Sequence, residues 1–507
     1  MNQTLEKFFS QNYMYIISII SLGFTLRIIF FPFDIPVLLD GLDYFMYAVD
    51  LSRGNVFPEG FLINKFGWGI FLSPFFSIFS NLEPIQLMNL QRVISIILSV
   101  STFIPLYIIA KKFFTDKVSL VVTSLFIFNP KIIENSLLGI SEPLFLLQMF
   151  LAVSFTLSNK TKFQLLGFLV ASFVFITRQE GIFIIFVLIF IIFFKNGINK
   201  KNLLLLLMGL IIFSGNLLII DFVINYNKEI SIFDPISNYI NLEENQNTIE
   251  KNQISDKNNL EILFINSIFN YSKYFILILL PYTLVFFILS VLKIKKICSK
   301  PKILFLSIGV ILSVTPLMLY GNNFEETRYL FPILLPVIMF SGISITWINN
   351  KLKNKKFLSI LLICIIFSSW FFLNFLIDDY TYFHELTFAI DYLVENADGV
   401  NSFKDSGFIR SYEIIKKWPI LPTLNDNLKS NWDLKRFNTN EYSEIESFVK
   451  DNQSQGLTHI LIKNKNPNIL FNELFENENK SYLKKVFDSD DYNFQNKIII
   501  FKIEFKE

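Results

Sequence analysis

Long apolar runs dominate this sequence and decide what it can fold into. Most approach the ~20 residues that a helix needs to cross the hydrocarbon core of a bilayer. Since backbone groups cannot stay unpaired in lipid, these runs are expected to be helical. We predict eleven membrane-spanning helices, at residues 12–32, 92–110, 118–134, 142–158, 163–177, 181–195, 203–221, 274–292, 303–320, 332–349 and 357–377. The shorter run 66–80, with Gly67, Gly69 and Pro74, predicts a re-entrant or surface-lying helix.

Composition agrees with a chain that is mostly dissolved in lipid. Of its 507 residues, 52% are hydrophobic and 17% are charged, whereas a soluble domain has about 25% charged residues. The predicted class is an all-α polytopic membrane protein with a small extracytoplasmic α/β domain at its C-terminal end. The net charge of +2 is small. We expect this chain to lie in a lipid bilayer and to bind no nucleic acid.

Alternate loops differ sharply in charge. Five of them hold seventeen lysines and one acid, Asp116; they are 111–117, 159–162, 195–202, 293–302 and 350–356. The other short loops hold only Lys131, Arg178 and Arg328 as basic residues. Because Lys and Arg collect in cytoplasmic loops, we predict a multi-pass plasma-membrane protein with a cytoplasmic N-terminus and its C-terminal part outside.

The predicted organisation is a transmembrane module, residues 1–377, followed by an extracytoplasmic domain, residues 378–507. The module carries two large outer loops, 33–91 and 222–273, the second expected to be only partly ordered. The C-terminal part is long enough for a small domain. Its patterns predict helices at 384–395 and 441–450 and strands at 458–463 and 497–504.

Strongly polar residues next to the spans, outside the Lys-rich loops, fall on the outer side. Asp40 and Asp43 follow the first span, three residues apart, so a helical turn places them on one face with Tyr44 nearby. Such a pair suits a general base, or a metal site for Mg²⁺ or Mn²⁺, which prefer oxygen ligands. The alternative is an interfacial loop with solvated acids.

Two further outer turns carry charge. Glu142 opens a span, where the helix dipole alone favours a carboxylate; it could also face the same cavity as the aspartates. Arg178 and Glu180 lie in the turn Thr-Arg-Gln-Glu-Gly. A guanidinium fixed at a membrane surface is a natural phosphate ligand, and an ion pair with Glu180 or a lipid headgroup is the alternative.

The last outer loop contains Glu325, Glu326, Arg328 and Tyr329 before an apolar run. Arg328 is a second candidate phosphate ligand, supported by Glu326 and Tyr329. An ordinary aromatic belt with a snorkelling cation would have the same sequence. The two histidines, His384 and His459, have no companion at metal-ligand spacing and are expected to be structural or at the surface.

The order of these motifs resembles a family. After the first span comes D-x-x-x-Y-x-x-x-A-x-x-x-x-x-G, from Asp40 to Gly54. It is followed by the apolar run, S-E-P-L-F, T-R-Q-E-G and R-Y-L-F-P-I-L-L-P. This order is similar to that of GT-C membrane glycosyltransferases, specifically the protein O-mannosyltransferase and aminoarabinose transferase branch. The resemblance covers residues 1–350, and the chain is similar to archaeal members of the family.

The resemblance implies a hexosyltransferase that takes a sugar from a polyprenyl (dolichyl)-phosphate donor and gives it to a protein or glycan outside the cytoplasm. It implies Asp40 as the base, Asp43 as its support or a metal ligand, and Arg178 and Arg328 on the lipid phosphate. The chain departs from the family in lacking its Asp-Glu pair, since Gly41 follows Asp40, and in lacking the Trp-Trp-Asp motif of oligosaccharyltransferases. We therefore do not expect transfer of a whole oligosaccharide to asparagine. A transporter or lipid flippase and a non-enzymatic scaffold for surface-glycan assembly remain as alternatives.

Overall fold

The computed structural model describes residues 2–504 apart from residue 39 and the segments 55–65, 229–256, 293–299, 322–325, 353–355, 377–379, 397–401, 404–441, 443, 455, 465–468, 472 and 477–479. The chain forms two compact units. Unit 1 comprises residues 1–31, 62–74 and 92–375, and unit 2 comprises 32–61, 75–91 and 376–507. Unit 2 therefore combines the C-terminal part of the chain with much of the segment 33–91, and the domain boundary at residue 377 stays a prediction.

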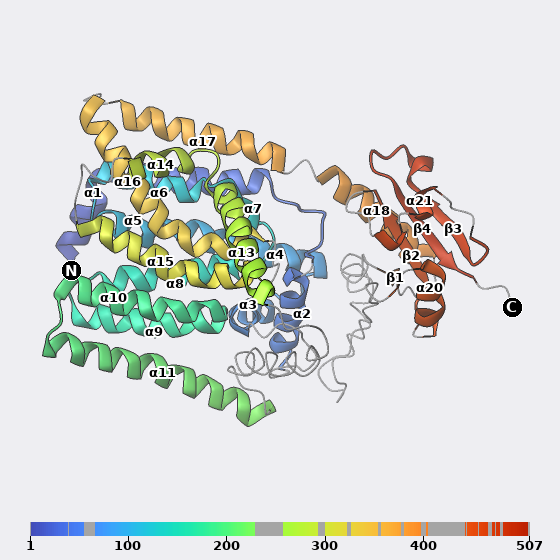
Figure 1. The fold of residues 1–507 in the computed structure, drawn as a ribbon, viewed down its shortest axis with the longest axis horizontal. Helices are drawn as coiled ribbons and strands as arrows, with labels where there is room; N and C mark the ends of the chain where they lie inside the picture. The colour runs from blue at the N-terminus through green and yellow to red at the C-terminus, as the bar shows by residue number, and fades with distance from the viewer. Residues whose placement is uncertain are drawn as a thin grey trace. The chain divides into compact units, whose positions relative to one another are not determined.

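Unit 1 is helical (Figure 1). Its helices are α1 (Asn2–Ile29), α5 (Phe103–Ala110), α6 (Asp116–Ile127), α7 (Pro130–Ser136), α8 (Glu142–Thr156), α9 (Thr161–Thr177), η1 (Gln179–Phe183), α10 (Ile184–Asn196), α11 (Lys200–Lys228), α13 (Lys257–Leu279), α14 (Thr283–Leu292), α15 (Lys300–Gly321), η4 (Thr327–Ile333), α16 (Leu334–Leu352) and α17 (Phe357–Leu376). Figure 1 shows α8, α9, α10 and α11 running alongside one another. The helices α3 (Phe66–Ile78) and α4 (Pro84–Ser101) each belong partly to unit 1 and partly to unit 2.

Among the described residues, five helices are long and apolar enough to cross a membrane: 84–110, 200–223, 303–321, 327–352 and 357–375. They correspond to five of the eleven predicted spans. The run α13–α14 adds a sixth if this bent pair is one span. Shorter apolar helices cover 13–29, 67–78, 142–156 and 161–177, so the 66–80 run is one helix with Pro74 inside it.

Two predicted spans are interrupted. The run 118–134 divides into α6 and α7, because the Asn129 side chain accepts hydrogen bonds from the amides of Lys131 and Ile132 and caps a new helix. The run 274–292 is bent by 113° between α13 and α14. In addition, α13 begins at Lys257, within the segment expected to be a loop. Hydropathy averaged along the sequence measures polarity and does not detect such interruptions of a helix.

Unit 2 contains a four-stranded sheet in the order β1-β2-β4-β3. The strands are β1 (Ser402–Phe403), β2 (His459–Lys463), β3 (Leu483–Asp488) and β4 (Ile498–Ile503). The helices of this unit include α2 (Asp40–Ser52), α18 (Tyr380–Asn396), α20 (Ile445–Gln453), η6 (Ile469–Phe471), α21 (Glu473–Glu476) and η7 (Ser489–Tyr492). The strand β4 pairs antiparallel with both β2 and β3, and β1 pairs parallel with β2.

The central strand β4 has an apolar core on each of its faces. Ile498 and Ile500 pack with Leu386 and Ile390 of α18. Ile499 and Phe501 point to the opposite face and pack with residues of α20 and α21. Side chains of a strand alternate between faces, so a strand apolar on both sides requires a covering layer on each. Ile35, from the first outer loop, joins the α18 core and ties that loop into unit 2.

Candidate functional site

A pocket of about 500 Å³, measured with its open mouth, lies within unit 1. It is formed by α8, the end of α9, η1, the start of α10, α15 and η4. Its apolar lining comprises Phe145, Met149, Val174, Phe183, Ile184, Leu312, Pro316, Phe331 and Pro332. Its charged lining comprises Glu142, Arg178, Glu180 and Arg328. A pocket lined by both charged and apolar side chains suits an amphipathic ligand.

The two arginines meet at one carboxylate. Arg178 forms an ion pair with Oε1 of Glu142, and Nη1 of Arg328 lies 3.6 Å from the same oxygen. Nη2 of Arg178 also lies 3.0 Å from Oε1 of Glu180, and Arg328 pairs with Glu326. Glu142 and Arg178 are only 1% and 3% exposed. The sequence-predicted residues of three separate turns are therefore assembled into one cluster.

The cluster has an inner and an outer part. Arg178 and Glu142 are almost completely buried, whereas the Arg328 side chain is 17% exposed and the Glu326 side chain 50% exposed. The Tyr329 ring contacts both guanidiniums, with its centroid 5.7 Å from Cζ of Arg178 and 5.7 Å from Cζ of Arg328. The electron-rich face of an aromatic ring attracts cations, so Tyr329 helps two like charges to stay close.

Tight backbone packing places Arg178. Its amide donates to the Val174 carbonyl at 3.0 Å, and the Gly181 amide donates to the Arg178 carbonyl at 2.8 Å. A Cβ on Gly181 would stand 2.7 Å from the Val174 oxygen, so the turn Thr-Arg-Gln-Glu-Gly requires a glycine there. A Cβ on Gly67 would stand 2.6 Å from Cα of Thr177. The first turn of α3 is thus pressed directly against the turn that carries Arg178.

The same helix also supports the loop before Glu142. Trp68 is fully buried, and its indole N–H donates to the Gly139 carbonyl at 3.0 Å. Gly139 adopts a φ of 71°, a conformation that favours glycine. The apolar pattern of residues 66–80 predicts a helix but does not predict this role. The signal was present in Gly67 and Trp68, a glycine and a large polar-tipped ring at the start of the run.

The oxygen Oε2 of Glu142 is buried and has no hydrogen-bond partner among the described residues. A buried acceptor without a partner is costly, and such a group commonly marks the place of a ligand or water. Glu325 was expected to accompany Glu326, but it lies outside the described residues.

Asp40 and Asp43 belong to unit 2, in the first turn of α2, and both are half-buried. The helical turn predicted for this pair is present. Tyr44 is only 2% exposed and packs in the interior of the unit, so its side chain is a core element. No group of three or more His, Cys, Asp or Glu side chains suited to a metal ion occurs among the described residues. The predicted aspartate pair therefore has no third His, Cys, Asp or Glu side chain placed for a shared metal ion within that part of the chain. His384 is exposed and His459 is buried beside Thr458.

No protein-family model matches this sequence, and no curated protein matches it either. Solved structures do match its fold. The oligosaccharyltransferase of Archaeoglobus fulgidus in its apo form aligns with a TM-score of 0.52 over 90% of this chain and 70% of that one, at 10% identity. The chain has the GT-C fold of an archaeal oligosaccharyltransferase.

Two other structures of oligosaccharyltransferase from Archaeoglobus fulgidus give the same result. AglB in complex with an inhibitory peptide and a dolichol-phosphate aligns with a TM-score of 0.50 over 89% of this chain and 70% of that one, at 9% identity. The complex with Zn and sulfate aligns with a TM-score of 0.52 over 87% and 67%, at 10% identity. The expected GT-C architecture is thereby confirmed at the level of fold, and the likeness does not single out the O-mannosyltransferase branch.

Proposed function

We propose that this chain is an integral-membrane glycosyltransferase that moves a sugar from a polyprenyl (dolichyl)-phosphate donor to an extracytoplasmic protein or glycan. The observation that carries the proposal is that Arg178 and Arg328 converge on Glu142 in the lining of a largely apolar pocket. The fold supports it, since the enzyme of the same fold has been seen with a dolichol-phosphate and a peptide.

The charge balance of the pocket shapes how a phosphate would bind. Two guanidiniums face three carboxylates, Glu142, Glu180 and Glu326. We propose that Glu142 is the fixed partner that holds both arginines. Glu326 is the exchangeable one, because an ion pair with a half-exposed carboxylate is worth only ~0–1 kcal/mol. A donor phosphate would take its place on Arg328 and gain a charge-assisted, bidentate contact.

The proposed chemistry is substitution at the anomeric carbon of the donor sugar. Asp40 removes the proton from the acceptor hydroxyl or amine, the acceptor atom bonds to the anomeric carbon, and the bond from that carbon to the phosphate oxygen breaks. The leaving lipid phosphate gains negative charge. Arg178 and Arg328 stabilise that charge. Because their guanidinium N–H groups are already held in position, they need little reorganisation during the reaction. Asp43 supports Asp40.

A divalent metal remains a prediction. Asp40 and Asp43 offer the oxygen ligands that Mg²⁺ and Mn²⁺ prefer, but the described residues supply no third His, Cys, Asp or Glu side chain beside them. The mechanism above therefore includes no step through a metal. Loss of transfer on chelation, with recovery by Mg²⁺ or Mn²⁺, would establish one.

We further propose transfer of a single hexose, as in the mannosyltransferase-like branch that the motif order resembles. Transfer of a whole oligosaccharide is the activity named for the structures of similar fold. The absence of the Trp-Trp-Asp motif from this sequence favours the simpler reaction. Analysing the product by mass separates the two, because one hexose and a preassembled chain differ in added mass.

The decisive experiment is a transfer assay with the purified chain in lipid and a panel of radiolabelled polyprenyl-phosphate sugars, with Asp40→Asn alongside. Transfer of label to an acceptor, or its hydrolysis from the donor, in the wild type alone would support the proposal and identify the sugar. Wild-type activity in Asp40→Asn would refute the base assignment. A transporter or flippase would instead move the intact donor across vesicles, and a scaffold would keep its function in Asp40→Asn.

A further inference from the structure

Two aromatic side chains stand out on the C-terminal part of unit 2. From residue 380 onward, Phe388 and Tyr492 are the only large hydrophobic side chains that are strongly exposed among the described residues, at 45% and 39%. They come from different elements, α18 and η7, yet their ring centroids are 5.0 Å apart. Two exposed rings in contact, where the other described large apolar side chains of this part of the chain are less exposed, form a surface feature that folding alone does not explain.

These rings are the outer layer of a larger cluster. The Tyr492 ring stacks on Phe487 at 5.1 Å with an interplanar angle of 12°, and Phe388 meets the edge of Phe494 at 5.6 Å. Tyr392 approaches Phe487 at 5.3 Å. Phe487 itself is buried in the core between α18 and the sheet. We call these five residues, Phe388, Tyr392, Phe487, Tyr492 and Phe494, the aromatic platform.

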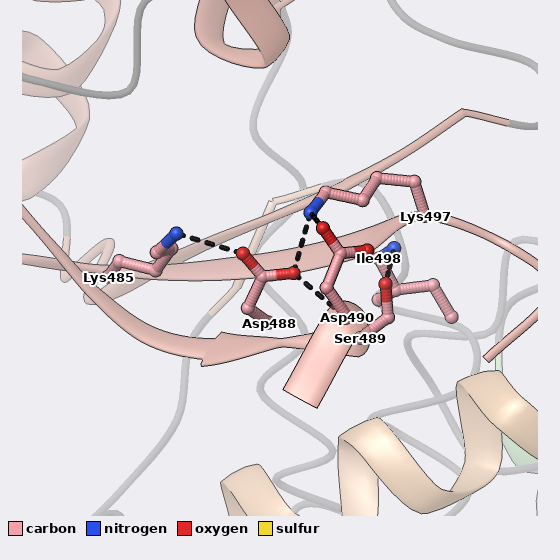
Figure 2. A network of polar contacts seen from close by, with 6 residues as sticks. All are labelled: Lys485, Asp488, Ser489, Asp490, Lys497 and Ile498. Atoms are coloured by element: carbon pink, nitrogen blue, oxygen red, sulfur yellow. Dashed lines mark hydrogen bonds and ion pairs between the residues drawn. The ribbon is translucent and has the colours of Figure 1, made fainter. Parts of the chain in front are cut away.

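The backbone that presents Tyr492 is held by a network of polar contacts (Figure 2). Asp488 accepts from the amide of Asp490 at 3.0 Å and from Nζ of Lys485 and Lys497 at 2.8 and 2.7 Å. Lys497 also pairs with Asp490. The hydroxyl of Ser489 accepts from the amide of Ile498 at 2.9 Å. This turn is therefore anchored to both strands on either side of it.

A second anchor joins the turn to α18. The carboxylate of Glu385 accepts from the amides of Gln495 and Asn496 at 2.6 and 3.0 Å, and from the side-chain amide of Asn496 at 2.7 Å. Phe388 lies one helical turn further along α18. Both exposed rings thus project from segments that these hydrogen bonds anchor to neighbouring elements, which restricts how the rings can move.

We propose that the aromatic platform is a carbohydrate-binding site. The apolar C–H face of a pyranose ring stacks on the electron-rich face of an aromatic ring. Its hydroxyl groups need acceptors at the rim, and Asp490 and Asp491 supply them. Asp490 has a side chain that is 70% exposed, and Asp491 is exposed as well. A small ligand with polar and apolar faces binds to a rigid aromatic surface that carries a few fixed polar groups.

The charge of the rim decides against a lipid surface. The turn carries three carboxylates, Asp488, Asp490 and Asp491, against two lysines, Lys485 and Lys497. Segments that adsorb to anionic membranes have an excess of Lys and Arg. A neutral, polyhydroxylated ligand is not repelled by the negative rim. The inference concerns binding and does not depend on the proposed transfer reaction.

The test uses the full-length chain in lipid nanodiscs and saturation-transfer NMR with neutral tetrasaccharides of mannose, glucose, galactose and N-acetylglucosamine. We expect at least one of them to bind the wild type. Phe388→Ala and Tyr492→Ala should each weaken binding about tenfold, equivalent to ~1.4 kcal/mol. Lys450→Ala, an exposed change on α20 away from the rings, should have no effect.

Phe388→Leu and Tyr492→Leu are the sharper variants. Leucine keeps an apolar surface but removes the ring face, so both should lose binding nearly as far as the alanine variants, while Tyr492→Phe should keep most of it. Leucine variants that bind like the wild type would overturn the proposal, because an apolar docking surface tolerates leucine.

Two further outcomes would also overturn the proposal: no binding of any tetrasaccharide, or occupation of the platform by anionic vesicles in place of sugars. Thermal unfolding of each variant checks that it is folded. Asp40→Asn should bind sugar normally, which separates a failure of this inference from a failure of the proposed transfer.

Discussion

Glu142 has the least ordinary environment of any single residue in the pocket. One of its oxygens faces two guanidiniums, while the other has no hydrogen-bond partner among the described residues. Removing one member of a buried ion pair leaves an uncompensated charge and costs ~3–5 kcal/mol. Glu142 and Arg178 are therefore poor targets for a functional test, since their loss would damage the fold. The outer pair, Arg328 and Glu326, is the informative one.

Arg328→Ala and Glu326→Gln should have opposite effects on donor use. Removing Arg328 deletes a phosphate ligand, so the apparent KM for the donor should rise about tenfold or more, in line with ~1.5–3 kcal/mol for a charge-assisted hydrogen bond. Glu326→Gln removes the competing carboxylate, so the apparent KM should stay the same or fall. Steady-state kinetics with a polyprenyl-phosphate sugar measures both. A higher KM for the acceptor, with the donor KM unchanged in Arg328→Ala, would contradict the phosphate role.

His459 makes the C-terminal part of the chain sensitive to acid. Burial, together with the smaller effect of the positive charge of Lys502, lowers the pKa of His459 to about 4. The unfolded chain, with a histidine pKa of about 6.5, takes up a proton more readily than the folded one. Stability should therefore fall as pH falls from about 6.5 to about 4. His459→Gln should remove this part of the pH dependence.

The chain has two histidines, and His384 is exposed, so His384→Gln is a matched control that should leave the pH dependence unchanged. Chemical denaturation followed by a probe in the C-terminal part, at pH 7 and at pH 5, measures the effect. Equal slopes of stability against pH in the wild type and His459→Gln would show that this histidine is not the sensor.

Among the elements, those with regular apolar periodicity could be predicted from the sequence. The helices α18 and α20 and the strands β2 and β4 lie within a few residues of their predicted positions. The strand β3 was missed because Lys484 and Lys485 follow each other and a bulge between Lys485 and Phe487 breaks the alternation. The start of α13 was missed because its first residues are polar, and the bend before α14 leaves no trace in average hydropathy.

The individual residues of the candidate site could be predicted from the sequence, but their arrangement could not. Charge next to a membrane span is rare enough to draw attention, so Glu142, Arg178 and Arg328 could be named from the sequence. Their convergence on one oxygen could not, because it depends on how α8, α9 and η4 pack. Gly67 and Trp68 were not named, because a packing role at an otherwise apolar helix start has no charge to reveal it.

Gly67→Ala should reduce transfer without touching any charge. An added Cβ would stand 2.6 Å from Cα of Thr177, which is backbone and cannot rotate away. Overpacking of this kind costs ~1–3 kcal/mol, and the displaced turn would carry Arg178 out of place. We expect transfer to fall about tenfold, with a lower unfolding temperature.

Gly215→Ala is the matched control, because a Cβ there, on α11, has no atom within 4 Å. Alanine in a helix interior is favoured over glycine by ~1 kcal/mol, so stability should stay equal or rise while transfer is unchanged. Equal transfer rates in Gly67→Ala and the wild type would show that α3 does not position the arginine turn.

At the scale of the whole molecule, the Lys-rich loops all fall on one side of the predicted topology. They therefore predict which surface faces the cytoplasm. All five Lys-rich loops are predicted to lie inside, which places the turns carrying Arg178 and Arg328 outside, where a sugar from a flipped lipid donor would be used. Single-cysteine labelling tests this in a Cys298→Ser, Cys364→Ser background, since the chain has two cysteines.

In that background, Ser447→Cys, at an exposed position of α20, should react with a membrane-impermeant maleimide added to intact cells. Lys201→Cys, at the exposed start of α11, should react only after the cells are opened. The two sites report on opposite faces, so their labelling should be mutually exclusive in intact cells. The reverse labelling pattern would mean that the pocket arginines face the cytoplasm. It would exclude an extracytoplasmic acceptor while leaving a cytoplasmic transfer reaction open, because the contacts among Glu142, Arg178 and Arg328 do not depend on which face is outside.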